Sequence, residues 1–287
     1  RAGAISANQV RLHNAVSGAV IPTETQRIDV GDAEIHTEIT GSGPDLLLVA
    51  GLGGRGAFWA NQIQPFAEHF RVITFDHRGC GESTPDKVVY GAEHMAKDVL
   101  ALMDAMGIEQ ASLVGHSTGG AIGQHIALDH PARLKKLVLS CSWAGPDTYL
   151  TELFRTRREI LISCGPLAYL TMGTYLAMPS SVLQPQMASA RKFMEERLAA
   201  FPGLEVELSR INAVYTHDLR SRLHQIKVPT LCIGSSDDQI TPPGFTEEMG
   251  ELIEGAETHL LTRGGHFAPI AATADYNPRV LEFLTAD

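Results

Sequence analysis

The sequence predicts an α/β fold, with a mostly parallel central sheet, helices on both of its faces and a helical lid inserted between two late strands. Two observations predict it. Short apolar runs alternate with longer helical patterns, and one long helical interruption separates the strand-like runs near 137–140 and 230–234. With 287 residues, of which 44% are hydrophobic and 20% charged, the chain is long enough to build a full core.

The elements follow in an order typical of crossover connections. A hairpin is expected first, because Gly31-Asp32 separates two strand-like runs at 27–30 and 34–39. Parallel strands are then expected at 46–50, 72–75, 112–115, 137–140, 230–234 and 258–261. Helices are expected near 59–69, 92–106, 119–130 and 277–284.

The interruption at 143–225 has a different character from the rest. It carries Met172, Met178, Met187 and Met194, half of the 8 methionines, on a helical periodicity. Such adaptable side chains suit a surface that accommodates a ligand, so we expect a lid; the alternative is an insertion whose methionines fill its own small core. The core domain would then comprise 27–142 and 226–287.

Residues 1–26 are expected to form an arm of uncertain order. They contain no basic region followed by an apolar stretch, so we expect no signal peptide there. No apolar run approaches the roughly 20 residues that cross a bilayer, and the formal net charge of -10 disfavours phosphate backbones and anionic lipids. We therefore expect neither a nucleic-acid nor a membrane partner.

The cysteines do not indicate a metal site. Cys80, Cys141, Cys164 and Cys232 lack metal-like spacing, and we expect buried, reduced thiols. That expectation fits a cytoplasmic enzyme without metal or cofactor.

The pentapeptide Gly115-His116-Ser117-Thr118-Gly119 matches the pattern G-x-S-x-G. It follows an apolar strand-like run and precedes a glycine-rich helix start, the context of a tight turn that presents a serine. Glycines are needed there because side chains would strike the neighbouring strand and helix. Ser117 is therefore the predicted nucleophile.

A serine hydroxyl needs a base, and in this arrangement an acid and then a histidine follow the serine along the chain. His266 stands in Gly264-Gly265-His266, after the last strand and before the final helix, and is the predicted base. The acid should follow the strand ending at Gly234, where Asp237 and Asp238 are adjacent candidates.

Backbone amides should stabilise the oxyanion of a tetrahedral intermediate. The amide of Thr118, next to the nucleophile, is one predicted donor. The glycine-rich loop after the strand at 46–50 supplies the other, for which we select Leu52. No Gly-Lys-Ser/Thr follows this loop, which excludes a nucleotide-binding loop.

In this order the motifs resemble the α/β-hydrolase superfamily over about residues 27–285. Gly51-Leu52-Gly53-Gly54 and Asp76-His77-Arg78-Gly79 resemble the aminoacrylate hydrolases of pyrimidine breakdown and the 3-oxoadipate enol-lactonases. The resemblance implies that Asp238, four positions before Pro242, is the acid, with Asp237 capping the loop or facing solvent. Two features depart from the pattern. Ala50-Gly51 replaces the usual His-Gly, and the aminoacrylate hydrolases need not carry a serine where this chain has Ser117.

The leading functional hypothesis is hydrolysis of a small carboxylic ester, lactone or related acyl compound through an acyl-enzyme. The substrate could bear a carboxylate, and we expect substrate contacts from Arg55, Trp143, Arg155 and Tyr169. Alternatives are a carbon–carbon bond hydrolase of ring-cleavage products and a slow-turnover ligand receptor that retains the triad. The serine disfavours members with an aspartate nucleophile, and a monomer or homodimer is expected.

Overall fold

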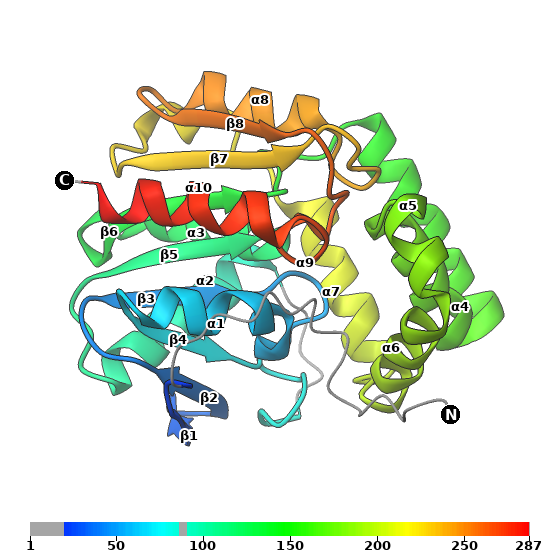
Figure 1. Cartoon of the computed structure of the whole chain (residues 1–287), viewed down its shortest axis with the longest axis horizontal. Helices are drawn as coiled ribbons and strands as arrows, with labels where there is room; N and C mark the ends of the chain where they lie inside the picture. Colours follow the sequence, from blue (N-terminus) through cyan, green and yellow to red (C-terminus); the bar gives the residue numbers. More distant parts are fainter. Residues whose placement is uncertain (1–19, 86–90, 287) are drawn as a thin grey trace, which may run out of the picture.

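A computed structural model describes residues 20–85 and 91–286, and Figure 1 shows their arrangement around one twisted sheet. The strand order is β1-β2-β4-β3-β5-β6-β7-β8. The strands are β1 (Thr23–Asp29), β2 (Glu34–Thr40), β3 (Asp45–Val49), β4 (Arg71–Phe75), β5 (Ala111–His116), β6 (Leu134–Ser140), β7 (Thr230–Ser235) and β8 (Glu257–Leu261).

The sheet is antiparallel at one edge and parallel elsewhere. β2 pairs antiparallel with both β1 and β4, and every other neighbouring pair is parallel. The predicted α/β fold is thereby confirmed. The chain passes from β3 to β4 on one side and later places β5 on the other side of β3, so the carboxyl ends of β3 and β5 flank the switch point at which such sheets bind ligands.

Helices cover both faces of the sheet (Figure 1). Those of the core domain are α1 (Ala60–Ala67), α2 (Ala92–Ala105), α3 (Thr118–Asp129), α8 (Pro243–Leu252), α9 (Ala268–Ala271) and α10 (Thr273–Thr285). Successive residues of β3 point to opposite faces of the sheet. Leu47 packs in the hydrophobic cluster that contains residues of α2, α3 and α8. Leu48 packs in the cluster that contains residues of α1 and α10.

The chain between β6 and β7 folds into four α-helices, here called the insertion. They are α4 (Thr148–Ala177), α5 (Ser180–Leu183), α6 (Met187–Ala199) and α7 (Leu204–Thr216). Figure 1 places α4, α5 and α6 beyond the carboxyl ends of the parallel strands. α4 is interrupted at Gly165, whose φ is 83°, before Pro166, so its two halves fold against each other across a kink.

By length and composition alone α4 could cross a membrane. It is the one such helix in the parts of the chain that the structure describes, and a third of its most apolar window is buried inside the protein.

Three observed features differ from the sequence-based expectations. β1 begins at Thr23, inside the segment assigned to the arm, because the hairpin continues its register to the pair Thr23–Thr40. The last helix begins at Thr273, so Pro278 lies inside it rather than in its first turn. Cys164 is exposed on α4, which corrects the expectation that all four thiols are buried; all four are free.

Candidate active site

Ser117 occupies the sharp turn between β5 and α3. Its backbone has φ 54° and ψ -118°, a left-handed conformation that costs a residue with a side chain about 1–3 kcal/mol. Glycines make the turn possible. A Cβ on Gly115 would lie 2.2 Å from the Gly119 carbonyl oxygen, and a Cβ on Gly119 would lie 2.1 Å from that of Val49. The turn is thus packed directly against the end of β3.

The strained residue is held by the last residue of β6 and by the segment just after that strand. The Ser117 amide donates to the Ser140 carbonyl over 2.8 Å, and the Ser142 hydroxyl donates to the Ser117 carbonyl over 2.9 Å. Both polar groups of the Ser117 backbone are therefore satisfied, and the side chain is left at the carboxyl edge of the sheet with 8% of the residue exposed.

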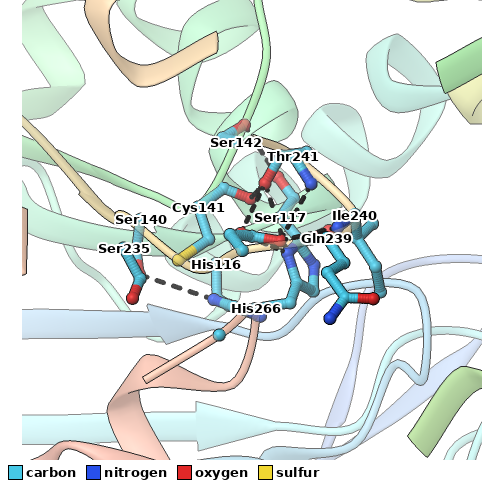
Figure 2. Close-up of polar contacts among 12 residues, drawn as sticks. His116, Ser117, Ser140, Cys141, Ser142, Ser235, Gln239, Ile240, Thr241 and His266 are labelled. Atoms are coloured by element: carbon cyan, nitrogen blue, oxygen red, sulfur yellow. Dashed lines mark hydrogen bonds and ion pairs between the residues drawn. The ribbon is translucent and has the colours of Figure 1, made fainter. Parts of the chain in front are cut away.

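His266 and Asp238 form a buried pair. Asp238 Oδ2 accepts from His266 Nδ1 over 2.9 Å, and Asp238 Oδ1 accepts from the amides of Ile240 and Thr241 over 2.7 and 3.0 Å. The Thr241 hydroxyl also contacts Asp238 Oδ2, at 2.9 Å. Figure 2 shows His266, Thr241 and Ser117 in one cluster. The carboxylate is thus fully partnered and fixes the His266 ring with Nε2 as its unbonded nitrogen.

Asp237 accepts hydrogen bonds from other residues than its neighbour Asp238 does. Its Oδ1 accepts from the Gly265 amide over 2.8 Å and from the Ser235 hydroxyl over 2.6 Å. It therefore ties the loop that carries His266 to the end of β7 and does not contact the imidazole.

His116 lies between the base and the aromatic wall of the site. Its ring stacks on Phe58 with centroids 4.5 Å apart and lies 4.9 Å from the His266 ring. Burial first, and then the nearby His266, hold the pKa of His116 well below its usual range. His116 is thus a neutral packing group, and its contact shows that His266 lies against the residue preceding Ser117.

The loop after β3 lies against the nucleophile, because a Cβ on Gly51 would come 3.0 Å from Ser117 Cβ. Arg210, from α7 and fully buried, donates from Nε to the Leu52 carbonyl over 2.8 Å and from Nη2 to the Gly51 carbonyl over 3.2 Å. His77 supports the same loop. Its Nε2 donates to the Ala50 carbonyl over 3.0 Å, and its amide donates to the Gly54 carbonyl over 2.7 Å.

These contacts orient the amide of Leu52. The carbonyl of one residue and the amide N–H of the next point in opposite directions across a trans peptide, so the Leu52 N–H points away from Arg210. The Thr118 amide stands at the first position of α3, where helix geometry provides no acceptor. Burial, reinforced by Arg210, lowers the pKa of His77 to about 3, so His77 stays a neutral donor.

Cys141, Asp238 and His266 place three potential metal-ligand atoms within 4.8 Å of one another. Burial holds the pKa of the Cys141 thiol well above its usual range, so the sulfur is protonated and a poor ligand. The other two groups already bind each other. The arrangement therefore suits proton transfer better than metal binding.

The four expected substrate contacts are scattered. Arg155 pairs with Glu152 on the exposed side of α4. Arg55 lines a small polar cavity with His36, Glu38 and Asp76, among residues that include no member of the predicted triad.

The two aromatic residues of that set are buried in packing contacts. Trp143 lies edge-on to the His217 ring at 5.6 Å. The Tyr169 hydroxyl donates to Glu207 over 2.6 Å. None of the four is hydrogen-bonded, ion-paired or ring-stacked to Ser117 or His266 within the described residues, so their role in binding stays a prediction.

The insertion is joined to the loop that carries His266. The Phe267 amide donates to the Ala177 carbonyl over 2.9 Å, and a Cβ on Gly265 would come 2.7 Å from the same oxygen. We call this contact the seam. It lets the end of α4 approach the residues on both sides of His266.

Three residues that support the site, Arg210, Thr241 and Ser142, were not predicted from the sequence. Arg210 and Ser142 donate to backbone carbonyls of residues that are distant in the sequence, so no local sequence pattern indicates them. Thr241 could have been found, because a hydroxyl residue three positions after the acid can fold back onto its carboxylate.

Comparisons with known proteins identify the family of the fold. A family profile described as alpha/beta hydrolase fold matches residues 44–272. A protein of Caulobacter vibrioides assigned as the carbamate hydrolase RutD is 35% identical over 266 residues, which cover 90% of this chain and 98% of that one.

Two solved structures are similar as well. The enol-lactonase of Burkholderia xenovorans LB400 superposes with a TM-score of 0.83 at 26% identity, covering 92% of this chain and all (100%) of that one. A thermophilic esterase of Thermogutta terrifontis, solved with malate bound, gives a TM-score of 0.80 at 26% identity, covering 91% and 98%.

Proposed function

Because the chain belongs to the α/β-hydrolase family and is a hydrolase of small substrates, we propose that it cleaves a carboxylic ester, lactone or related acyl compound through a serine acyl-enzyme. The observation that carries the proposal is the buried His266–Asp238 pair beside a serine on a strained, glycine-lined turn. The substrate class includes carbamates, since the relative from Caulobacter is assigned to carbamate hydrolysis.

In the proposed reaction Ser117 Oγ attacks the acyl carbon while His266 Nε2 takes its proton. Asp238 holds the Nδ1 proton and stabilises the imidazolium as it forms, because its carboxylate is fixed by two amides and cannot rotate away. The protonated His266 then donates to the leaving group, and a water deprotonated by the same ring releases the acyl group from Ser117.

The amides of Leu52 and Thr118 are proposed to receive the oxyanion. The Thr118 amide belongs to the first turn of α3, whose dipole favours negative charge. The Leu52 amide is oriented by Arg210, which holds the carbonyl on the other side of the same peptide. Two preorganised donors of this kind are worth several kcal/mol in a transition state, about 2.7–4 kcal/mol for a single one.

We further propose that the insertion acts as a lid. It joins the core at the seam and through Arg210, so it contacts both the loop of the base and the loop of the oxyanion. A lid with these contacts excludes water from the reacting centre and shapes the acyl pocket.

The test combines a covalent probe with a substrate panel. A fluorophosphonate should label the wild-type protein, and Ser117→Ala should abolish both labelling and turnover while leaving the melting temperature near that of the wild type. Short methyl esters, enol-lactones and alkyl carbamates then divide the acyl classes, and a dienoic ketone tests carbon–carbon bond cleavage. Full turnover by folded Ser117→Ala would refute the acyl-enzyme.

A further inference from the structure

We propose that the insertion contains a buried carboxylate-binding subsite centred on the Arg157 guanidinium, which receives the acidic end of a substrate whose acyl carbon is attacked by Ser117. The proposal deepens the proposed function and rests on it. It names the substrate as the monoester, lactone or carbamate of a short acid that keeps one free carboxylate.

Arg157 is buried and has no hydrogen-bond or ion-pair partner among the residues that the structure describes. Only 7% of the residue is exposed, and its guanidinium carbon lies 4.7 Å from the Phe154 ring centre and 4.9 Å from that of Tyr169. Its Nε is enclosed without a hydrogen bond, and no ion pair reaches the guanidinium from any residue in 20–85 or 91–286. Arginine stays charged in proteins, so this is a buried cation that packs against two aromatic rings.

The nearby charges leave the region positive. Tyr169 has Arg157, Arg197 and Glu207 as electrostatic neighbours. Arg197, half-buried on α6, interacts with the buried Glu207 and with Arg157 as well. The Glu207 carboxylate already accepts the Tyr169 hydroxyl over 2.6 Å. One carboxylate and two guanidinium groups thus lie around Tyr169, so a second negative charge would be stabilised there.

The shape of the surroundings favours a planar monoanion. The guanidinium lies over two aromatic rings, so we expect a ligand to approach its edge, where a carboxylate binds in a two-point fork. Gly173 keeps that edge uncrowded, since a Cβ there would lie 3.1 Å from Arg157 Nη2. The Glu207 charge close by would repel the second charge of a phosphate dianion more strongly than a carboxylate.

The subsite adjoins the reacting residues through one apolar cluster. Phe154 and Tyr169, the ring partners of Arg157, belong to the cluster that also contains Ala121 of α3 and, packed against it, Leu52 and Phe267. Leu52 carries a proposed oxyanion amide and Phe267 follows the proposed base. A short acyl chain lying along this cluster would connect Ser117 to Arg157.

The experiment compares matched acidic and neutral substrates. Monomethyl esters of C4–C6 dicarboxylic acids and methyl esters of the corresponding monocarboxylic acids are followed by pH-stat with the wild type, Arg157→Gln and Arg158→Gln. Arg158 is the matched control, because its side chain is 46% exposed and pairs with Glu159. Loss of a charge-assisted contact should lower the acidic-to-neutral ratio of kcat/KM by about tenfold or more in Arg157→Gln. An unchanged ratio in folded Arg157→Gln, or an equal drop in Arg158→Gln, overturns the subsite.

A binding measurement keeps the proposal testable if Arg157→Gln does not fold. Glutarate should bind saturably to Ser117→Ala protein in calorimetry and should compete with neutral ester hydrolysis in the wild type, whereas the neutral diamide of glutaric acid should do neither. Equal behaviour of diacid and diamide overturns the subsite. Failure of the proposed function is recognised separately, by the absence of ester turnover and of Ser117-dependent labelling.

Discussion

Replacing Arg210 by methionine removes the side chain that holds the Gly51 and Leu52 carbonyls from α7. Methionine preserves most of the buried apolar stem but donates no hydrogen bond. The peptide between these residues is then free to rotate, and the Leu52 amide no longer points in one direction. If this amide stabilises the oxyanion, the loss should appear in the transition state rather than in substrate binding.

The expected loss of kcat depends on which contacts still hold the loop after β3. Complete loss of an oxyanion donor typically lowers kcat by about 100- to 1000-fold. His77 still holds the Ala50 and Gly54 carbonyls at the two ends of the loop, so only part of this effect is expected. We expect kcat to fall by about 10- to 100-fold with KM changed less than about threefold. The lysine of Arg210→Lys can reach one of the two carbonyls, so the kcat of this variant should lie between those of the wild type and Arg210→Met.

The assay is steady-state hydrolysis of the best neutral ester, with circular dichroism to establish folding. Arg191→Met is the matched control, because the Arg191 side chain is 80% exposed on α6 and pairs with Glu195. A folded Arg210→Met enzyme with wild-type kcat would refute the orienting role. A rise in KM at constant kcat would refute it too, and would make Arg210 a substrate contact.

Three further predictions concern the acid, the turn and pH. Asp238→Asn should lower kcat by about 10⁴-fold, because it removes the carboxylate that pairs with His266. Asp237→Asn should lower the free energy of unfolding by about 1 kcal/mol and change kcat little. Equal losses of kcat in paired assays would contradict the assignment of Asp238 as the acid. Gly119→Ala should prevent a stable fold in urea unfolding, since its Cβ would lie 2.1 Å from the Val49 carbonyl oxygen, and a wild-type midpoint would argue against this packing. Burial first, and then His125, lower the pKa of His217 from 6.5 to about 3. Between pH 6.5 and 3 the unfolded chain therefore binds a proton at this ring that the native state does not, and the free energy of unfolding falls by about 2 kcal/mol between pH 7 and 5. His217→Phe should lose less stability over the same range. An identical pH dependence of the variant and the wild type would exclude this cause.

The sheet was predictable because buried parallel strands are continuous apolar runs, which the sequence displays directly. The predicted strand at 112–115 and helix at 119–130 correspond to β5 and α3, and their junction placed Ser117. The choice between Asp237 and Asp238 needed the family resemblance, since adjacent aspartates after one strand look alike. In the structure Asp238 accepts from His266 Nδ1 and from the amides of Ile240 and Thr241. Asp237 accepts from the Gly265 amide instead.

The substrate contacts were harder to predict, because they depend on how the insertion folds over the core. Arg155 and Arg157 are two positions apart on one helix, and side chains at that spacing do not share a face. The helical turn places Arg155 in solvent beside Glu152 and Arg157 between two aromatic rings. Without the position of the kink at Gly165, which brings Tyr169 back onto the first half of α4, periodicity could not distinguish them.

The seam between Ala177 and Phe267 sets a condition for engineering. An exchange of insertions among relatives would need a donor whose counterpart of α4 ends with a carbonyl at the position of Ala177, and a recipient loop with no side chain at Gly265. Chimeras that keep this junction should retain a correctly placed histidine while changing the acyl pocket. Chimeras that break the junction should lose activity toward every substrate alike. Substrate range can therefore be changed without loss of catalysis only if the exchange leaves the hydrogen bond between Phe267 and Ala177 intact.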